Sequence, residues 1–180
     1  DNEGCLYVVD GRASFSGSAS VGFAASMSIC GTEEDGYLGW NAAPQLADFD
    51  VDGTIDLAVS AQGVGEVYVF FDASSLSGTL DTSAADVTIT VSSPNYFGWS
   101  LATGDYDADG LADLAIGAPD GTSFDSSPDE EGVVFLYSGA TLAAASGALT
   151  DADATGAIYS TGTDLFGLTI VMGDIDGDGK

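Results

Sequence analysis

The stretch YFGWSLATGDYDADGLADLAIGAPDG, residues 96–121, places acidic side chains at alternate positions between two apolar segments. The closely spaced aspartates within it are Asp105, Asp107, Asp109 and Asp113, and Gly110 follows the third of them. Two unit charges 4 Å apart repel by about 1 to 4 kcal/mol at surface-like dielectrics, so carboxylates that converge here need a compensating cation. The spacing therefore favours a loop that binds a metal ion.

The same pattern occurs three times along the chain. The other two copies are YLGWNAAPQLADFDVDGTIDLAVSAQ, residues 37–62, and LFGLTIVMGDIDGDGK, residues 165–180. The copies align without internal gaps, and their first aspartates, Asp48, Asp105 and Asp174, are separated by 57 and 69 positions. These intervals are on the order of those in propeller-type repeats. An inserted polar loop, residues 122–131, accounts for the longer interval.

Short β-prone segments lie between the acidic runs and are bounded by Gly, Ser, Asp or Pro, which indicates strands joined by turns. Each full repeat offers four of them, as in the four-stranded antiparallel blade of a β-propeller. Several segments are apolar on both sides, as expected for sheets that are buried on both faces. Helical periodicity is nearly absent, and we expect the Ala-rich residues 139–154 to form a loop.

The sequence therefore predicts an all-β chain of propeller-type blades, two complete and two partial. Residues 1–36 supply the end strands of a partial blade, residues 37–95 and 96–164 supply complete blades, and residues 165–180 start a further blade that stops inside its acidic loop. A closed propeller typically has 4 to 8 blades. We expect the chain to be an excerpt of a longer protein, with assembly of several copies or an open arc as the alternatives.

The acidic loops predict two complete Ca²⁺ sites. Carboxylates at positions 1, 3, 5 and 9 and the backbone carbonyl at position 7 form an all-oxygen set, which favours Ca²⁺ over Mg²⁺ because Mg²⁺ keeps its waters. The predicted ligands of the first loop are Asp48, Asp50, Asp52, Thr54 and Asp56. Those of the second are Asp105, Asp107, Asp109, Leu111 and Asp113, and the incomplete third set is Asp174, Asp176 and Asp178.

Two other interpretations of the acidic loops compete with this one. An EF-hand needs a bidentate Glu at position 12, where this chain has Val59 and Ile116, and it needs flanking helices. A metal-free hairpin turn needs only one or two aspartates, whereas each complete loop has four.

The segment FGWSLATGDYDADGLADLAIGAP resembles the FG-GAP repeat of integrin α-subunit β-propellers and their bacterial relatives. Phe97-Gly98 matches the "FG" and Gly117-Ala118-Pro119 matches the "GAP". The resemblance implies that the acidic loop joins the first two strands of a blade and holds Ca²⁺, and that the protein serves extracellular adhesion or ligand recognition. The first copy departs from the pattern, with Leu38-Gly39 for "FG" and residues 59–62, VSAQ, for "GAP".

The amino-acid composition of the chain limits the classes of molecule that it can bind. The 180 residues include 2 Lys+Arg and 29 Asp+Glu, for a net charge of -27, so the chain repels nucleic acid and attracts cations. No segment approaches the roughly 18 apolar residues of a membrane span. Cys5 and Cys30 form either a disulfide or two buried thiols, and the pair favours an extracytoplasmic compartment. Adaptation to high salt is a rival explanation for the acidity.

Catalysis is disfavoured because the chain lacks His and has one Lys at its end. A carboxylate pair in the inserted loop would suit a carbohydrate-active enzyme, but a solvated acidic loop is the simpler interpretation. The expected function is recognition of a protein or carbohydrate at the cell surface, and a structural repeat that contacts further copies of itself is the alternative. Trp40 and Trp99 share a repeat position, which favours core anchors over sugar-stacking platforms.

Overall fold

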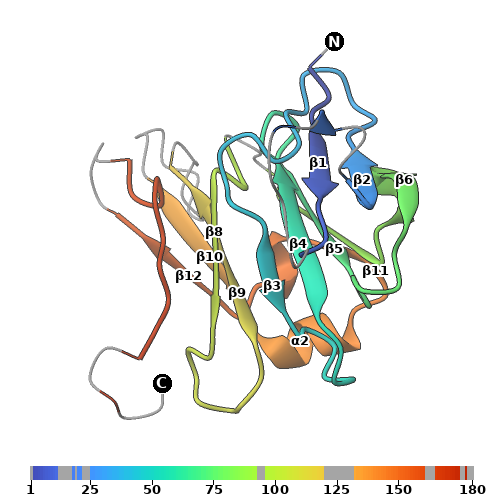
Figure 1. Cartoon of the computed structure of the whole chain (residues 1–180). Coiled ribbons are helices and arrows are strands. Elements are labelled where there is room, and N and C mark those ends of the chain that lie inside the picture. Colours follow the sequence, from blue (N-terminus) through green and yellow to red (C-terminus); the bar gives the residue numbers. More distant parts are fainter. Residues whose placement is uncertain are drawn as a thin grey trace.

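The computed structural model describes residues 2–11, 18, 20–21, 25–92, 96–119, 132–160, 165–174 and 177. The predicted inserted loop, residues 122–131, lies outside this part of the chain. The described strands form three sheets that follow one another across the molecule in chain order (Figure 1). No helix in the described ranges is long and apolar enough to cross a membrane.

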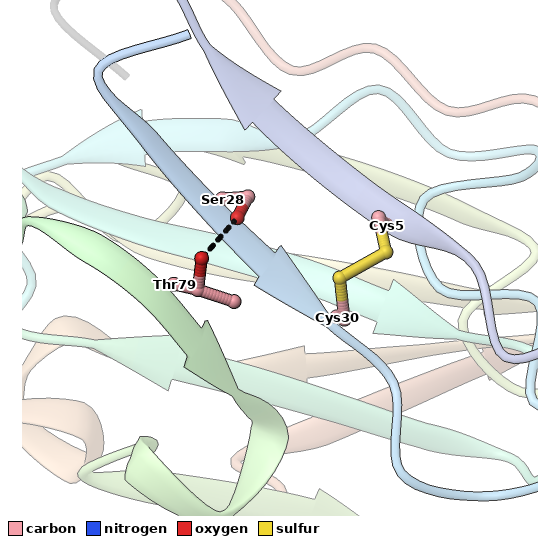
Figure 2. Close-up of a disulfide and its surroundings, with 4 residues drawn as sticks. All are labelled: Cys5, Ser28, Cys30 and Thr79. Carbon is pink, nitrogen blue, oxygen red and sulfur yellow. Dashed lines mark hydrogen bonds between the residues drawn. A yellow bond between two sulfur atoms is a disulfide. The ribbon is translucent and has the colours of Figure 1, made fainter. Parts of the chain in front are cut away.

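The first sheet has the order β1-β2-β6 and consists of β1 (Cys5–Val8), β2 (Met27–Cys30) and β6 (Gly78–Asp81). β1 and β2 are antiparallel, and Cys5 lies opposite Cys30. A disulfide joins these two cysteines, whose Cα atoms are 4.1 Å apart (Figure 2). Because the crosslink spans 25 positions, it stabilises the fold by about 3 kcal/mol through the entropy of the unfolded chain.

The second sheet contains an antiparallel run of four strands. These are β3 (Gln45–Ala47), β4 (Asp56–Ala61), β5 (Glu66–Phe70) and β7 (Val87–Thr90). A fifth strand, β11 (Gly147–Leu149), adds to the edge of the sheet in parallel with β7. This strand comes from the following repeat in the sequence.

The third sheet is again an antiparallel run of four strands. It consists of β8 (Ser100–Gly104), β9 (Asp113–Ala118), β10 (Val133–Tyr137) and β12 (Gly156–Tyr159). The second and third sheets thus repeat the same strand order, first to fourth. The predicted all-β class, with four antiparallel strands per repeat, is confirmed.

Two of the strands link successive sheets in a way that the sequence did not predict. β6 and β11 each lie between the third and fourth strands of their own repeat, yet each pairs in parallel with the last strand of the preceding sheet. In both cases a leucine lies opposite a fully buried isoleucine, Leu80 opposite Ile29 and Leu149 opposite Ile89. Ser28 Oγ also donates to Thr79 Oγ1, 3.4 Å away, across β2 and β6 (Figure 2).

The core lies between the sheets, because each central sheet is apolar on both faces. All six residues of β4 and all six of β9 are buried. One cluster joins the second and third sheets through residues such as Val67, Ile89 and Phe135. A second cluster joins the first and second sheets, and a third packs Ile170 and Met172 against the far face of the third sheet. The expectation of two-sided burial therefore holds.

The Phe97-Gly98 turn fits between the second and third sheets. Phe97 is fully buried and meets the edge of Phe135 at a centroid distance of 5.5 Å. Gly98 has a left-handed φ of 84°. A Cβ atom at Gly98 would lie 2.9 Å from Ser60 Cβ. Only glycine satisfies both constraints.

Two local predictions were wrong. Residues Gly139–Ala144 form the helix α2, with Ser138 Oγ accepting a hydrogen bond from Thr141 N, 3.3 Å away. Trp40 is 71 % exposed and contacts the edge of Tyr37 at a centroid distance of 5.6 Å, so it is not a core anchor. Trp99 is half-buried. Tyr37 and Tyr96 share a left-handed conformation, with φ of 54° and 56°, and Tyr96 also meets its tryptophan edge to face, so this turn alone does not account for the exposure of Trp40.

The first repeat has Ser60 where the second has Gly117, and this difference generates a stability prediction. Ser60 Oγ is buried and has no hydrogen-bond partner among the described residues. Because an unpaired buried hydroxyl costs about 1 to 3 kcal/mol, Ser60→Ala should raise the free energy of unfolding by about 1 kcal/mol in urea denaturation.

Ser100→Ala is the matched control, because Ser100 is also buried but its Oγ donates to the Gly167 carbonyl oxygen, 2.6 Å away. This substitution should lower the free energy of unfolding. Equal losses in both variants would contradict the assignment of Ser60 as an unpaired group.

Candidate metal centre

The first acidic loop connects β3 to β4 and brings three carboxylates together. One oxygen from each of Asp48, Asp50 and Asp56 lies within 4.8 Å of the other two. These residues hold positions 1, 3 and 9 of the repeat. Like charges this close repel by about 1 to 3.5 kcal/mol per pair between water-like and surface-like dielectrics.

The second loop, between β8 and β9, has the same arrangement. Its grouped carboxylates are those of Asp105, Asp107 and Asp113, again within 4.8 Å of one another. The two groups use identical repeat positions. The clustering is therefore a property of the repeat and does not depend on one loop.

Backbone amides shape each loop around its first aspartate. Asp48 accepts hydrogen bonds from Asp52 N at 3.1 Å and from Gly53 N at 3.0 Å. Asp105 accepts the equivalent bonds from Asp109 N at 3.1 Å and from Gly110 N at 2.9 Å. The glycines have left-handed φ values of 93° and 85°, which explains why both loops carry glycine at position 6.

The aspartate at position 9 is buried and ties the loop to the rest of its sheet. Asp113 Oδ2 accepts from Tyr106 N at 2.6 Å, and its Oδ1 accepts from Gly139 N at 2.7 Å. Asp56 makes the same pair of contacts, with Phe49 N at 2.6 Å and Asp72 N at 2.9 Å. Each carboxylate thereby joins the acidic loop to the end of the third strand.

The aspartate at position 5 of each loop has different contacts from the aspartates at positions 1, 3 and 9. Asp52 Oδ1 accepts from Thr54 N at 2.7 Å, and Asp109 Oδ1 accepts from Leu111 N at 2.8 Å. Neither aspartate belongs to the grouped carboxylates. Ligation by Asp52 and Asp109, and by the carbonyls of Thr54 and Leu111, stays a prediction.

The third copy is described only in part. Asp174 is exposed, and its Oδ1 accepts from Gly177 N at 2.6 Å. Asp176 and Asp178 lie outside the described residues. The third predicted site therefore stays a prediction.

Burial and hydrogen bonding move the pKa values in opposite directions. Burial raises the pKa of Asp56 and of Asp113 above the usual 3.8, although backbone amides partly offset this effect. Desolvation likewise raises the pKa of Asp50, with neighbouring carboxylates adding to the effect. Hydrogen bonds from Thr54 lower the pKa of Asp52. Asp50, Asp56 and Asp113 thus hold their charge less readily than isolated carboxylates.

The donor set suits a hard cation. The grouped ligand atoms are all carboxylate oxygens, without the nitrogen or sulfur that zinc or copper would favour. A bound cation would compensate the repulsion that the loop geometry imposes. Each cluster can therefore hold a metal ion.

The comparisons with known proteins agree with this geometry. The FG-GAP repeat family profile matches residues 97–137. Residues 97–137 form an FG-GAP repeat. Integrin alpha-4 of Xenopus laevis is 39 % identical over 90 residues, which cover 47 % of this chain and 8 % of the integrin. The chain is thus an FG-GAP, integrin-α-like repeat protein, although the match covers only a small part of the integrin.

Each acidic loop also depends on one residue that sequence reasoning missed. Asp72 and Gly139 each follow the third strand of their sheet by two positions and donate their backbone N–H to the aspartate at position 9. Their side chains differ, but each lies seven positions after the glycine that precedes the third strand, Gly65 or Gly132. This equal spacing is the signal in the sequence that could have found them.

The buried contacts of the FG-GAP repeat predict a structural role for Asp113 beyond any metal. Asp113→Asn replaces one acceptor oxygen by an amide that faces a backbone N–H. It should therefore lower the free energy of unfolding by about 2 kcal/mol in EDTA, measured by urea denaturation.

The control is Asp109→Asn, which changes an exposed carboxylate of the same loop. That variant should lose less than about 0.5 kcal/mol under the same conditions. Similar losses in both variants would contradict the role assigned to the buried aspartate.

Proposed function

We propose that this chain is part of an extracellular, calcium-binding β-propeller module that recognises a ligand at the cell surface. One observation carries the proposal: two FG-GAP-like loops each gather three carboxylates, at positions 1, 3 and 9, within 4.8 Å. Neither loop has a basic side chain to neutralise this charge. A divalent cation is the simplest compensation.

Calcium is the cation that the ligand chemistry favours. Ca²⁺ accepts six to eight oxygen ligands at flexible geometry, whereas Mg²⁺ demands an octahedron and keeps several waters. The first ion would be held by Asp48, Asp50 and Asp56, and the second by Asp105, Asp107 and Asp113. Asp52, Asp109 and the carbonyl oxygens of Thr54 and Leu111 would complete the two shells.

Recognition at the cell surface is supported by the similarity to an integrin, by the disulfide and by the net charge of the chain. The identity to integrin alpha-4 over 90 residues favours a protein ligand, and a carbohydrate ligand stays an alternative. The Cys5–Cys30 disulfide suits an oxidising compartment outside the cytosol. The net charge of -27 argues against a nucleic-acid partner.

The propeller proposal divides the chain into consecutive blades. Residues 37–95 and 96–164 would be complete blades, with residues 1–36 and 165–180 belonging to the blades on either side. In support, the four-stranded runs β3-β4-β5-β7 and β8-β9-β10-β12 fall within the two central segments. The first four-stranded run also buries both of its faces against neighbouring sheets.

A structural repeat of a surface assembly is the second candidate. The observation that favours it is the pairing of β6 and of β11 with the sheet that precedes their own repeat. Such pairing joins each sheet to the next in one direction, as in an array of stacked repeats. Contact with further copies of the chain would then replace ligand recognition as the main role.

The calcium proposal predicts a specific thermal stabilisation. Because Ca²⁺ would bind the folded loops and not the unfolded chain, each site adds roughly 2.7 kcal/mol at a concentration 100-fold above its dissociation constant. Melting curves at fixed ionic strength should therefore rise by several degrees in millimolar Ca²⁺ relative to EDTA.

Mg²⁺ and NaCl serve as controls, and an equal rise in melting temperature with either would contradict a calcium site and favour a general effect of charge.

The rise in melting temperature with Ca²⁺ should also shrink on acidification. Since the pKa values of Asp56 and Asp113 lie above 3.8, protons compete with Ca²⁺ already at a pH above that value.

A further inference from the structure

The two acidic loops differ at one point of contact. In both, a residue after the third strand donates its backbone N–H to the aspartate at position 9, but this residue is Asp72 in the first repeat and Gly139 in the second. Asp72 has a left-handed φ of 53°, a conformation that Asp tolerates better than most residues. At this position, therefore, the first repeat has an additional carboxylate and the second repeat has none.

A single hydroxyl joins the Asp72 carboxylate to the first loop. Thr54 Oγ1 lies 2.7 Å from Asp72 Oδ1 and 2.5 Å from Asp52 Oδ1. A hydroxyl carries one hydrogen and can donate to only one of the two carboxylates at a time. The other carboxylate is left facing an oxygen, so negative charge accumulates on this side of the loop.

The second loop cannot reproduce this arrangement. Position 7 is Leu111, which has no hydroxyl. A Cβ atom at Gly139 would lie 2.4 Å from Leu111 Cβ and 2.9 Å from the Ala112 carbonyl oxygen. The backbone after β10 therefore leaves no room for a side chain at position 139.

We propose that Asp72 makes the first loop the tighter of the two calcium sites, so that it fills first. This inference rests on the calcium function proposed above. Asp72 acts through its charge and through the Thr54 hydroxyl, which links it to the predicted ligand Asp52. One added unit charge about 10 Å from a divalent ion raises its affinity by roughly 4-fold at a water-like dielectric and by roughly 100-fold or more at a surface-like one, so a change of about tenfold is expected for an exposed loop.

The experiment measures Ca²⁺ affinity by calorimetric titration in two single-loop chains. Asp105→Asn with Asp107→Asn disables the second loop, and Asp48→Asn with Asp50→Asn disables the first. Asp72→Asn is then added to each chain. This variant keeps an acceptor for Thr54 Oγ1 and the backbone donor to Asp56, so the melting temperature in EDTA should not fall.

With only the first loop active, Asp72→Asn should weaken Ca²⁺ binding roughly tenfold. The residual affinity should also depend less on ionic strength, which a purely structural effect would not produce. With only the second loop active, the substitution should change nothing. Thr54→Val should give a smaller loss, because it removes the hydroxyl and leaves the charge.

Unchanged affinity of the first loop, or equal losses in both single-loop chains, would overturn the role of Asp72. A lower melting temperature in EDTA together with unchanged salt dependence would also overturn it, in favour of a structural contact. No Ca²⁺ binding by either single-loop chain before Asp72→Asn is added would refute the underlying calcium proposal and this inference with it. The two failures are therefore distinguishable.

Discussion

A buried aspartate at the start of the second strand of each repeat organises the structure around it. Asp56 and Asp113 are fully buried, and each accepts backbone hydrogen bonds from the acidic loop and from the end of the third strand. Three segments of a repeat are thus fixed by one carboxylate. Burying that charge is unfavourable unless it is well paired, and the amides supply part of the pairing.

The negative charge that these amides do not offset lies on the solvent side of the loop. The same aspartates stand within 4.8 Å of two further carboxylates, and burial raises their pKa values. A cation placed among these oxygens would offset both the desolvation and the repulsion. Loop folding and metal binding would therefore be coupled through residues that also hold the sheet together.

Much of this arrangement could be predicted from the sequence. The period of the acidic runs and the Gly-bounded apolar segments gave the four-stranded repeat, and the D-x-D-x-D-G-x-x-D spacing singled out the residues that the structure groups. The parallel pairing of β6 and β11 could not be predicted, because it depends on how successive sheets stack. The exposure of Trp40 could not be predicted from the repeat, because Trp99 occupies the same repeat position and is half-buried. Helix α2 was missed because it has only six residues.

The central claim is that the grouped carboxylates of each loop bind one cation while they also accept hydrogen bonds from backbone amides. A crystal structure grown with Ca²⁺, with anomalous scattering recorded, tests it most directly. Anomalous density is predicted between Asp48, Asp50 and Asp56 and between Asp105, Asp107 and Asp113, with Asp56 and Asp113 keeping their amide contacts. Loops that keep their folded geometry and show no anomalous density at saturating Ca²⁺ would contradict the account.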